Sequence, residues 1–286
     1  MLQLQRGRSL KEFSTFGIGG PIRFFAEMRS LEDAREAFAW IVQEKIPYLI
    51  LGKGSNCLFS DIGFDGLVLL NKIDHCSWKE NGVEVGAGYS FSLLGAQSAR
   101  KGLSGLEFAS GIPATVGGAV FMNAGANGQE TCDVLQSVQF LHLDGSLETF
   151  PKKTLHFSYR TSSFQTMQGA IVSASFVLTP SEKARPAQLT ILSKRMETQP
   201  YKEKSIGCIF RNPAANVFAG KLIDECGLKG LQIGGVKISE MHANFIVNVQ
   251  EASAQNVLEL IEIVRKKVFE KTGYELEIEA RMVGFL

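Results

Sequence analysis

A short loop in the first quarter of the chain carries residue types that can bind an anion. Residues 52–56 read Gly-Lys-Gly-Ser-Asn and follow an apolar stretch, residues 48–51. Successive backbone N–H groups without bulky side chains can form a nest around a phosphate or pyrophosphate. A tight turn uses the same residue types, so the loop alone leaves both interpretations open.

A second segment, residues 102–128, is rich in glycine and poor in charge. It reads GLSGLEFASGIPATVGGAVFMNAGANG, with seven glycines and one charged side chain, Glu107. A flexible linker would be rich in serine or lysine, and the interior of a buried strand does not tolerate this much glycine. Such a backbone can instead lie close to a large flat ligand. Together with residues 52–56 it points to a dinucleotide with a bulky head group, a description that FAD fits.

Other nucleotide-binding and catalytic motifs are absent from the sequence. No G-x-G-x-x-G follows a predicted strand and no G-x-x-x-x-G-K-[ST] occurs, which argues against Rossmann and P-loop sites. The sequence also lacks G-x-S-x-G, H-E-x-x-H and the protein-kinase motifs. The four histidines are spread far apart, so we expect no metal site.

The composition excludes several classes of partner. The net charge is +1 and no basic stripe is visible, so we expect no nucleic-acid partner. No apolar stretch approaches the ~18 residues of a membrane span, and the N-terminal MLQLQRGRSLKEF lacks the apolar run of a signal peptide. Five scattered cysteines without a C-x-x-C pair indicate reduced thiols. These features predict a cytoplasmic protein without membrane association.

Local sequence patterns predict an α+β chain. Residues 30–44 should form a helix, because Ser30 and Asp33 make a capping-box start and apolar residues recur at helical spacing. A strand over residues 48–51 then leads into the glycine loop, and Ser90 is expected to cap a further helix that runs to Lys101. Further strands are expected at residues 66–70, 82–85 and 138–143, the last followed by a hairpin turn at Asp144-Gly145.

The C-terminal third is predicted to be a separate α/β unit. Residues 180–200 are more polar, contain a helical stretch at 188–197, and are interpreted as a domain boundary. The clearest helix of the chain opens at Ser253 and stops at Gly273. One face of this helix carries Val257, Leu260, Ile261, Val264 and Val268.

Seven motifs together resemble those of one enzyme family. They are STFGIGGP (14–21), LGKGSNCLFSD (51–61), ASGIPATVGGAVFMNAGANG (109–128), FSYRTSSF (157–164), GCIFRNP (207–213), KLIDECGLKGLQIGGVKISEMHANFIVN (221–248) and LEIEARMVG (276–284). The set resembles UDP-N-acetylenolpyruvoylglucosamine reductase, the bacterial flavoenzyme family called MurB. The matches stand in the family's order and cover nearly the whole chain. The length, without a long tyrosine-bearing insertion after Tyr159-Arg160, looks like the shorter of the family's two types.

The resemblance implies a fold and a cofactor. The fold would be α+β, with a two-lobed FAD-binding domain of the vanillyl-alcohol-oxidase type (lobes 1–70 and 71–187) and a C-terminal α/β substrate-binding domain (195–286). Some relatives of this flavin fold attach FAD through a histidine. The one histidine between residues 47 and 128 is His75, which lies in the polar segment DHCSW, so we expect non-covalent FAD. The implied cofactor-binding residues are Gly52, Lys53, Gly54, Ser55, Asn56, Leu58, Gly111, Thr115, Gly117, Gly118, Asn123 and Gly125.

The implied reaction has two halves. NADPH reduces FAD, and reduced FAD then delivers hydride to the enolpyruvyl vinyl group of UDP-N-acetylglucosamine-enolpyruvate. The product is UDP-N-acetylmuramate, which is used for peptidoglycan. The partner is thus a small molecule, and no obligate protein partner is indicated.

Two charged residues match the family's catalytic positions. Hydride addition leaves negative charge beside the reacting carbon, so the site needs positive charge or strong donors there, and an acid. Arg160 matches the arginine that holds the substrate carboxylate, and Glu279 matches the catalytic glutamate. Alternate residues of a strand share a face, so we expect Glu277, Glu279 and Arg281 to lie together. The implied substrate-binding residues are Tyr159, Asn212, Lys221, Asn244 and Arg281.

Cys208 is a departure from the family pattern. The family usually has Gly-Ser-x-Phe, in which the serine hydroxyl donates the proton that completes the reduction, whereas this chain reads Gly207-Cys208-Ile209-Phe210. A thiol with a pKa of ~8.5 is mostly protonated at neutral pH, and we favour Cys208 as the proton donor. The alternative is a small packing residue, with another group or water supplying the proton.

Two other functions are compatible with parts of the sequence. A different flavin oxidoreductase on the same fold, such as an aldonolactone or alcohol oxidase, would share both glycine segments but has no reason to carry GCIFRNP and LEIEAR. A regulatory protein that binds a nucleotide sugar without catalysis would explain Cys208. The presence of Arg160 and Glu279 argues against it.

Overall fold

The computed structural model describes residues 2–285, and these form two compact units. The first unit takes in the chain up to Gln5, then Phe24–Lys53 and Gly66–Arg195. The second takes in Arg6–Arg23, Gly54–Asp65 and the chain from Met196 onward. The division after Arg195 falls inside the polar stretch at residues 180–200. The membership of two early segments in the second unit has no counterpart in the sequence patterns.

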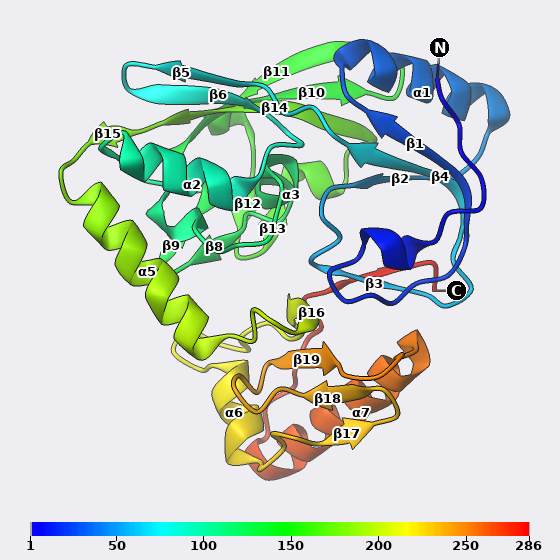
Figure 1. Cartoon of the computed structure of the whole chain (residues 1–286), viewed down its shortest axis with the longest axis vertical. Coiled ribbons are helices and arrows are strands. Elements are labelled where there is room, and N and C mark those ends of the chain that lie inside the picture. The colour runs from blue at the N-terminus through cyan, green and yellow to red at the C-terminus, as the bar shows by residue number, and fades with distance from the viewer. Residues whose placement is uncertain (1, 286) are drawn as a thin grey trace. The chain divides into compact units, whose positions relative to one another are not determined.

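The first unit contains a three-stranded sheet of order β1-β4-β2, built from β1 (Ile22–Met28), β4 (Phe64–Asn71) and β2 (Tyr48–Leu51). Helix α1 (Leu31–Glu44) lies between β1 and β2 in the chain (Figure 1). Its first turn has the expected capping box, because Ser30 Oγ accepts from the Asp33 N–H and the Asp33 carboxylate accepts from the Ser30 N–H. Its apolar face packs with strand residues Leu67 and Leu69 in one core cluster.

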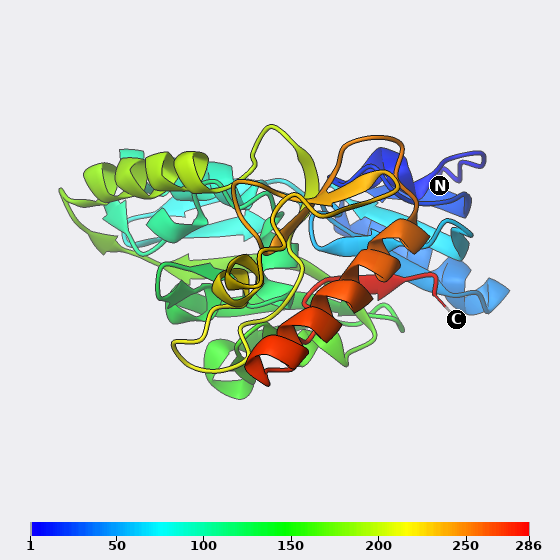
Figure 2. The ribbon, with the colours of Figure 1, turned by 90° about the horizontal axis from the view of Figure 1, so that it is seen from below.

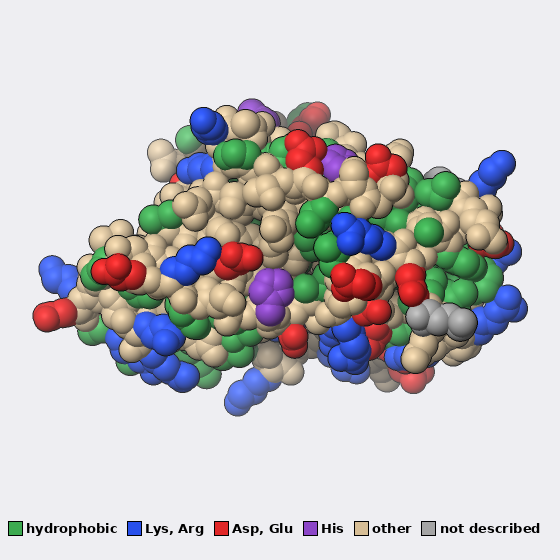
Figure 3. Space-filling view, turned by 90° about the horizontal axis from the view of Figure 1, so that it is seen from above, with side chains coloured by type: hydrophobic (Ala, Val, Ile, Leu, Met, Phe, Trp, Pro, Cys, Tyr) green, Lys and Arg blue, Asp and Glu red, His purple; other side chains and the backbone are tan. Residues whose placement is uncertain are grey.

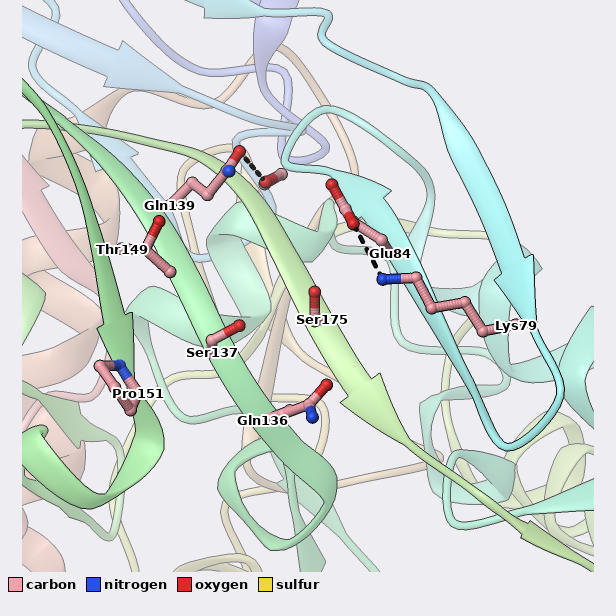
Figure 4. A pocket seen from close by; sticks show the side chains of 9 residues that line it. Lys79, Glu84, Gln136, Ser137, Gln139, Thr149, Pro151 and Ser175 are labelled. Carbon is pink, nitrogen blue, oxygen red and sulfur yellow. Dashed lines mark hydrogen bonds and ion pairs between the residues drawn. The ribbon is translucent and has the colours of Figure 1, made fainter.

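The larger sheet of the first unit is antiparallel and has the order β11-β10-β14-β6-β5. Helices α2 (Phe91–Arg100) and α3 (Val116–Phe121) share a core with it, which includes Val138 and Phe140. The polar residues that alternate with them, Ser137 and Gln139, line a shallow polar hollow on the opposite face (Figure 4). The strands are β5 (Cys76–Lys79), β6 (Gly82–Gly86), β10 (Leu135–His142), β11 (Leu147–Pro151) and β14 (Gly169–Val177).

Short elements complete the first unit. Ser90 caps α2 as expected, since its Oγ accepts from the Leu93 N–H. Helix α5 (Ala184–Thr198) begins four residues before the expected start at 188 and carries the chain from one unit to the other. The remaining elements are β7 (Leu103–Ser104), β8 (Gly125–Ala126), β9 (Gln129–Glu130), α4 (Thr131–Val134), β12 (Phe157–Ser158), β13 (Thr161–Ser162), β15 (Thr179–Pro180) and the 3-10 turns Glu107–Ala109, Lys152–Thr154 and Ser163–Gln165.

The second unit is a four-stranded antiparallel sheet with two helices. The sheet order is β16-β19-β18-β17, and α7 packs along it (Figure 2). The five apolar residues expected on one face of α7 are at most 1% exposed, so the predicted face is confirmed. The elements are β16 (Lys204–Cys208), β17 (Gln232–Ile233), β18 (Val236–Ile238), β19 (Phe245–Asn248), α6 (Ala219–Glu225), α7 (Ala254–Thr272) and the 3-10 turn Leu10–Phe13.

A parallel two-stranded pair joins distant parts of the chain within the second unit. Strand β3 (Cys57–Phe59) pairs with β20 (Arg281–Val283), the last strand of the chain. The Asp61 carboxylate, just after β3, accepts from the Ala254 N–H at the start of α7 at 2.9 and 3.1 Å. These bonds hold the segment at residues 54–65 to the C-terminal elements.

The surface and the helices agree with the composition. Lysine and arginine are interspersed with acidic side chains on the face shown in Figure 3. Within residues 2–285, none of the helices has the length and apolar character that a membrane crossing requires.

Removal of the α7 cap should weaken this helix. The Ser253 Oγ accepts from the Asn256 N–H at 3.1 Å, and Asn256 Oδ1 accepts from the Ser253 N–H at 3.3 Å. We predict that Ser253→Ala lowers the free energy of opening of α7 by about 1 kcal/mol, because an N–H at the helix start loses its partner. Amide hydrogen exchange of α7 peptides measures this energy directly.

The matched control is Ser77→Ala on exposed strand β5, which should change exchange of α7 by less than about 0.5 kcal/mol. Equal exchange of α7 in wild type and Ser253→Ala would show that the cap contributes nothing.

Candidate active site

The glycine loop keeps its backbone donors available. None of the five N–H groups of residues 52–56 donates to another group of residues 2–285. Gly54 has φ +60°, and an added Cβ would lie 2.1 Å from the Phe13 carbonyl oxygen, so both conformation and space require glycine. The Lys53 Nζ donates to Ser90 Oγ at 3.2 Å. A row of unused backbone donors beside a lysine is a suitable site for a pyrophosphate.

The second glycine-rich segment approaches this loop at Thr115. A Cβ on Gly52 would lie 2.4 Å from Thr115 Oγ1, so glycine is needed for the contact. The N–H groups of Val116, Gly117 and Gly118 donate to Tyr89 O, Ala87 O and Thr115 Oγ1. These three N–H groups therefore already have partners within the first unit.

Ser110 supplies a polar group that the sequence reasoning missed. It is 1% exposed, and its Oγ has no hydrogen-bond partner among the described residues. A buried hydroxyl without a protein partner is unusual and is available to a ligand or a water molecule. Its neighbour Gly111 donates its N–H to Ser92 Oγ at 2.7 Å. The position of Ser110 beside Gly111 in the ASGIP motif is the signal that could have identified it. The Ser110 hydroxyl is thus a polar group of the first unit that remains available to a ligand.

Asn123 is a buried anchor within the same unit. It is fully buried with φ +42°. Its carboxamide donates to the Glu130 carboxylate at 2.7 Å and to the Ser158 carbonyl at 3.1 Å, and accepts from the Cys132 N–H at 3.0 Å. Asn123 thus ties the end of the glycine segment to the strand that leads to Arg160.

Arg160 stands in a two-residue turn between β12 and β13. Its φ is +56°, and its guanidinium donates to the Gly125 carbonyl at 3.3 Å and lies over the Tyr159 ring at 4.7 Å from the centroid. Gln165 Nε2 donates to the carbonyls of Arg160 and Phe121, each at 3.0 Å. The unit therefore brings Tyr159, Arg160 and Gly125 together and holds the turn rigidly. Sequence reasoning missed Gln165, since nothing local marks its contacts.

Cys208 is the last residue of β16 in the second unit. It pairs with Phe245, and the register of β16 against β19 shifts between Ser205 and Cys208. Gly207, immediately before it, has φ +80°. The bulge thus falls on the residues just before the half-buried Cys208, and bulges are common near functional sites.

We expected Glu277, Glu279 and Arg281 to lie on one regular strand, but the strand is shorter. Strand β20 begins only at Arg281, so the three residues do not share one strand. The preceding residues instead bridge to the segment after Cys208, because the Glu279 N–H donates to the Ile209 carbonyl at 2.8 Å. The Arg281 N–H donates to the Asn56 carbonyl at 2.9 Å. Glu279 is half-buried and Glu277 is exposed.

Cys57 lies beside Arg281 in the β3–β20 pair. Burial raises the pKa of the Cys57 thiol to about 11, and the nearby charge of Arg281 opposes this rise. Cys57 is therefore protonated at neutral pH. Ser55 and Asn56 precede it, and the Asn56 amide donates to the Glu279 carbonyl at 3.4 Å.

The remaining expected site residues of the second unit differ in accessibility. Leu58 is fully buried in the core, and Lys221 is highly exposed, with its Nζ 3.7 Å from the Glu225 carboxylate. Exposed Asn212 accepts from the Ala219 N–H at 3.1 Å. Asn244 is 3% exposed, and both ends of its carboxamide bind the Phe210 backbone. Each unit therefore carries its own set of site residues, with Arg160 in the first and Cys208 and Glu279 in the second.

Two domain families match parts of the chain. Residues 199–283 match the domain family described as UDP-N-acetylenolpyruvoylglucosamine reductase, C-terminal domain, and residues 22–150 match the FAD binding domain. The UDP-N-acetylenolpyruvoylglucosamine reductase of Protochlamydia amoebophila is 55% identical over 284 residues, which cover 99% of this chain and 95% of that protein. The corresponding protein of Chlamydia muridarum is 50% identical over 283 residues, with 99% and 95% covered.

A solved structure gives the same result. The crystal structure of UDP-N-acetylenolpyruvylglucosamine reductase (MurB) from Thermus caldophilus has a TM-score of 0.84 and 37% identity, and the match covers 99% of this chain and 100% of that one. The fold and the FAD-binding domain define the chain as a flavoprotein, and the expected α+β fold with an FAD-binding domain and a further C-terminal domain is confirmed. The chain belongs to the UDP-N-acetylenolpyruvoylglucosamine reductase (MurB) family.

A side chain at position 54 should impair FAD binding. We predict that Gly54→Ala retains FAD about tenfold more weakly or worse, because the added Cβ must displace Phe13 and the left-handed φ is strained. Flavin absorbance per protein and FAD titration of the apoprotein measure the effect.

Gly145→Ala is the matched control. It has φ +85° in the β10–β11 turn with nothing within 4 Å of the new Cβ, so it carries the backbone strain without the clash. If Gly54→Ala bound FAD as tightly as the wild type does, the loop would not be part of the cofactor site.

Proposed function

We propose that this chain catalyses the reaction for which its family is named, the NADPH-dependent reduction of UDP-N-acetylglucosamine-enolpyruvate to UDP-N-acetylmuramate for peptidoglycan synthesis. The observation that carries the proposal is membership of this family over 99% of the chain, with the FAD-binding domain included. The chain is an FAD-containing oxidoreductase. The readings as a different flavin oxidoreductase or as a non-catalytic binding protein have no comparable support.

The residues of the glycine segments fit FAD as the resident cofactor. Residues 52–56 would hold the pyrophosphate with backbone N–H groups, and the Ser110 hydroxyl would donate to or accept from the cofactor. When bound, FAD supplies the carrier that takes hydride from NADPH and passes it to the vinyl group of the substrate. We propose non-covalent attachment, because His75 is the one histidine between the two segments.

Arg160 is assigned to the substrate carboxylate. Negative charge develops there when hydride reaches the vinyl carbon, and a fixed guanidinium stabilises such charge most when it needs no reorganisation. The clamp of the turn by Asn123 and Gln165 supports this role, because it fixes the backbone from which the guanidinium extends. Tyr159, beneath the guanidinium, is assigned to the same end of the substrate.

Cys208 is assigned the proton that completes the reduction. The carbon next to the carboxylate takes the thiol proton as its C–H bond forms, and the thiolate left behind regains a proton from solvent. The bulge just before Cys208 supports the assignment, since a bulge re-aims side chains and is common beside active sites. Glu279 is assigned to proton handling on the same unit, where its backbone is bonded to Ile209.

The other substrate contacts and the domain bounds are proposals of the same kind. Asn212, Lys221 and Arg281 are assigned to the UDP-sugar. The division into lobes 1–70 and 71–187 and a substrate domain 195–286 also stays a proposal, as does a cytoplasmic location.

Purified protein tests the function directly. It should be yellow, bleach with NADPH, and regain its colour when UDP-N-acetylglucosamine-enolpyruvate is added. A colourless protein that takes up no added FAD would overturn the proposal.

Loss of either charged group should affect one half-reaction. We predict that Arg160→Lys and Glu279→Gln each leave FAD binding and flavin reduction by NADPH largely intact. Reoxidation by substrate should slow by ~10² or more, the scale for one preorganised charge or proton-handling group. Stopped-flow absorbance separates the two halves. A variant that loses its flavin instead would mark that residue as structural.

Substitutions at Cys208 test the proton donor. Cys208→Ser should keep substantial activity, because the family normally uses that hydroxyl. Cys208→Ala should accept hydride from NADPH but lose most turnover with the UDP-sugar. Near-normal turnover in Cys208→Ala would show that the proton comes from another group.

Alkylation gives an independent check on Cys208. Wild-type activity should be sensitive to iodoacetamide and protected by substrate, whereas Cys208→Ser should be nearly immune. Burial raises the pKa of the thiols of Cys57, Cys76 and Cys132, which limits their competing reaction. Mass spectrometry must map the modified position, and inactivation without label at Cys208 would contradict the assignment.

A further inference from the structure

Asn244 is a buried residue whose polar groups all bind within the second unit. Its Nδ2 donates to the Phe210 carbonyl at 2.8 Å, and its Oδ1 accepts from the Phe210 N–H at 3.0 Å. Its carbonyl accepts from the Ile209 N–H at 2.9 Å, and its N–H donates to His242 Nδ1 at 3.2 Å. With 3% of its surface exposed, it offers little area to a nucleotide sugar.

The carboxamide of Asn244 continues the backbone pairing beyond the point where the ladder between β16 and β19 ends. Strands β16 and β19 are paired irregularly up to Cys208 and Phe245, and Gly207 breaks the regular conformation. Beyond that point Phe210 meets the amide of Asn244, which offers one donor and one acceptor as a peptide group of a neighbouring strand would. Asn244 therefore fixes one edge of the two residues that follow Cys208.

The opposite side of the same segment holds Glu279. The Ile209 carbonyl accepts from the Glu279 N–H at 2.8 Å, and the Arg211 N–H donates to the Glu277 carbonyl at 2.9 Å. Phe210 and Ile278 form an antiparallel bridge. Residues 209–211 thus lie between Asn244 and the backbone of Glu279, and a shift of this segment moves both Glu279 and Cys208.

We propose that Asn244 is a positioning residue for Cys208 and Glu279 rather than the substrate contact that its motif implies. This inference rests on the proposed function of those two residues. Loss of the carboxamide leaves the buried Phe210 N–H and carbonyl without partners, so the segment must move to find others. A displacement of ~1 Å at reacting groups can slow a reaction by ~10².

Two variants test the role. Asn244→Leu removes both bonds to Phe210 at similar volume, and Asn244→Asp keeps the acceptor but places an oxygen against the Phe210 carbonyl. In each, the rate of flavin reoxidation at saturating UDP-N-acetylglucosamine-enolpyruvate should fall about tenfold or more. The substrate concentration at half-maximal rate should change less than about threefold, and flavin content and reduction by NADPH should stay at wild-type values. A raised half-saturation with an unchanged maximal rate would instead identify Asn244 as a substrate contact.

Asn248→Leu is the matched control for a purely structural effect. Half-buried Asn248 lies four residues further along, and its carboxamide binds the Phe16 carbonyl and the Ala252 N–H, away from Cys208 and Glu279. Both variants should lower the thermal stability of the protein, but only Asn244→Leu should slow reoxidation. Equal losses of rate in both would overturn the proposal.

A double mutant shows whether Asn244 acts through Cys208. On a Cys208→Ala background, Asn244→Leu should slow reoxidation less than it does alone, because the group that it positions is already gone. Full additivity would count against the proposal. If Asn244→Leu does not fold, Asn244→Asp carries the test. Wild-type protein that never reduces the UDP-sugar would overturn the proposed function itself, whereas an active wild type with an unaffected Asn244→Leu would overturn only this inference.

Discussion

The parallel pairing of β3 with β20 is the interaction on which the second unit depends. It holds the end of the chain against the strand that follows the glycine loop, so that Asn56 bonds to the backbone of both Glu279 and Arg281. Asn56 and Glu279 are 223 residues apart in sequence. The position of the proposed proton-handling glutamate is therefore coupled to the loop whose backbone donors are unused within residues 2–285. A change in either strand alters the position of both.

The elements that local signals specify were predictable from the sequence. The capped starts of α1, α2 and α7, the strand before the glycine loop and the apolar face of α7 follow from spacing and cap residues alone. The bonds made by Asn244 and Gln165 could not be predicted. They join residues 34 and 44 positions apart, and only the folded backbone brings a carboxamide beside the right carbonyl. The bridge at residues 277–279 could not be predicted for the same reason. The alternation of side chains along a strand does not tell which segment the strand pairs with.

The division into units shows a related limit. The polar stretch at residues 180–200 has a composition that marks a boundary, and the division does fall there. Residues 6–23 and 54–65 carry no such mark, because their membership of the second unit comes from tertiary bonds. Asp61 binds the start of α7, and Thr15 donates to the Ser205 carbonyl at 2.7 Å. The sequence motifs identified the family and the cofactor. The hydrogen bonds that connect the proposed site residues to one another are visible only in the folded structure.

The discontinuous second unit has a consequence for synthesis on the ribosome. Strand β3 emerges early, whereas its partner β20, Arg281–Val283, is synthesised much later. Pairing over so long an interval requires closure of a very large loop, which is entropically unfavourable and slow. The first unit can complete its own strands by residue 195, while β3 lacks its partner until residues 281–283 have been made. The newly made chain thus passes through a stage that a chaperone could recognise, and synthesis of β20 ends that stage.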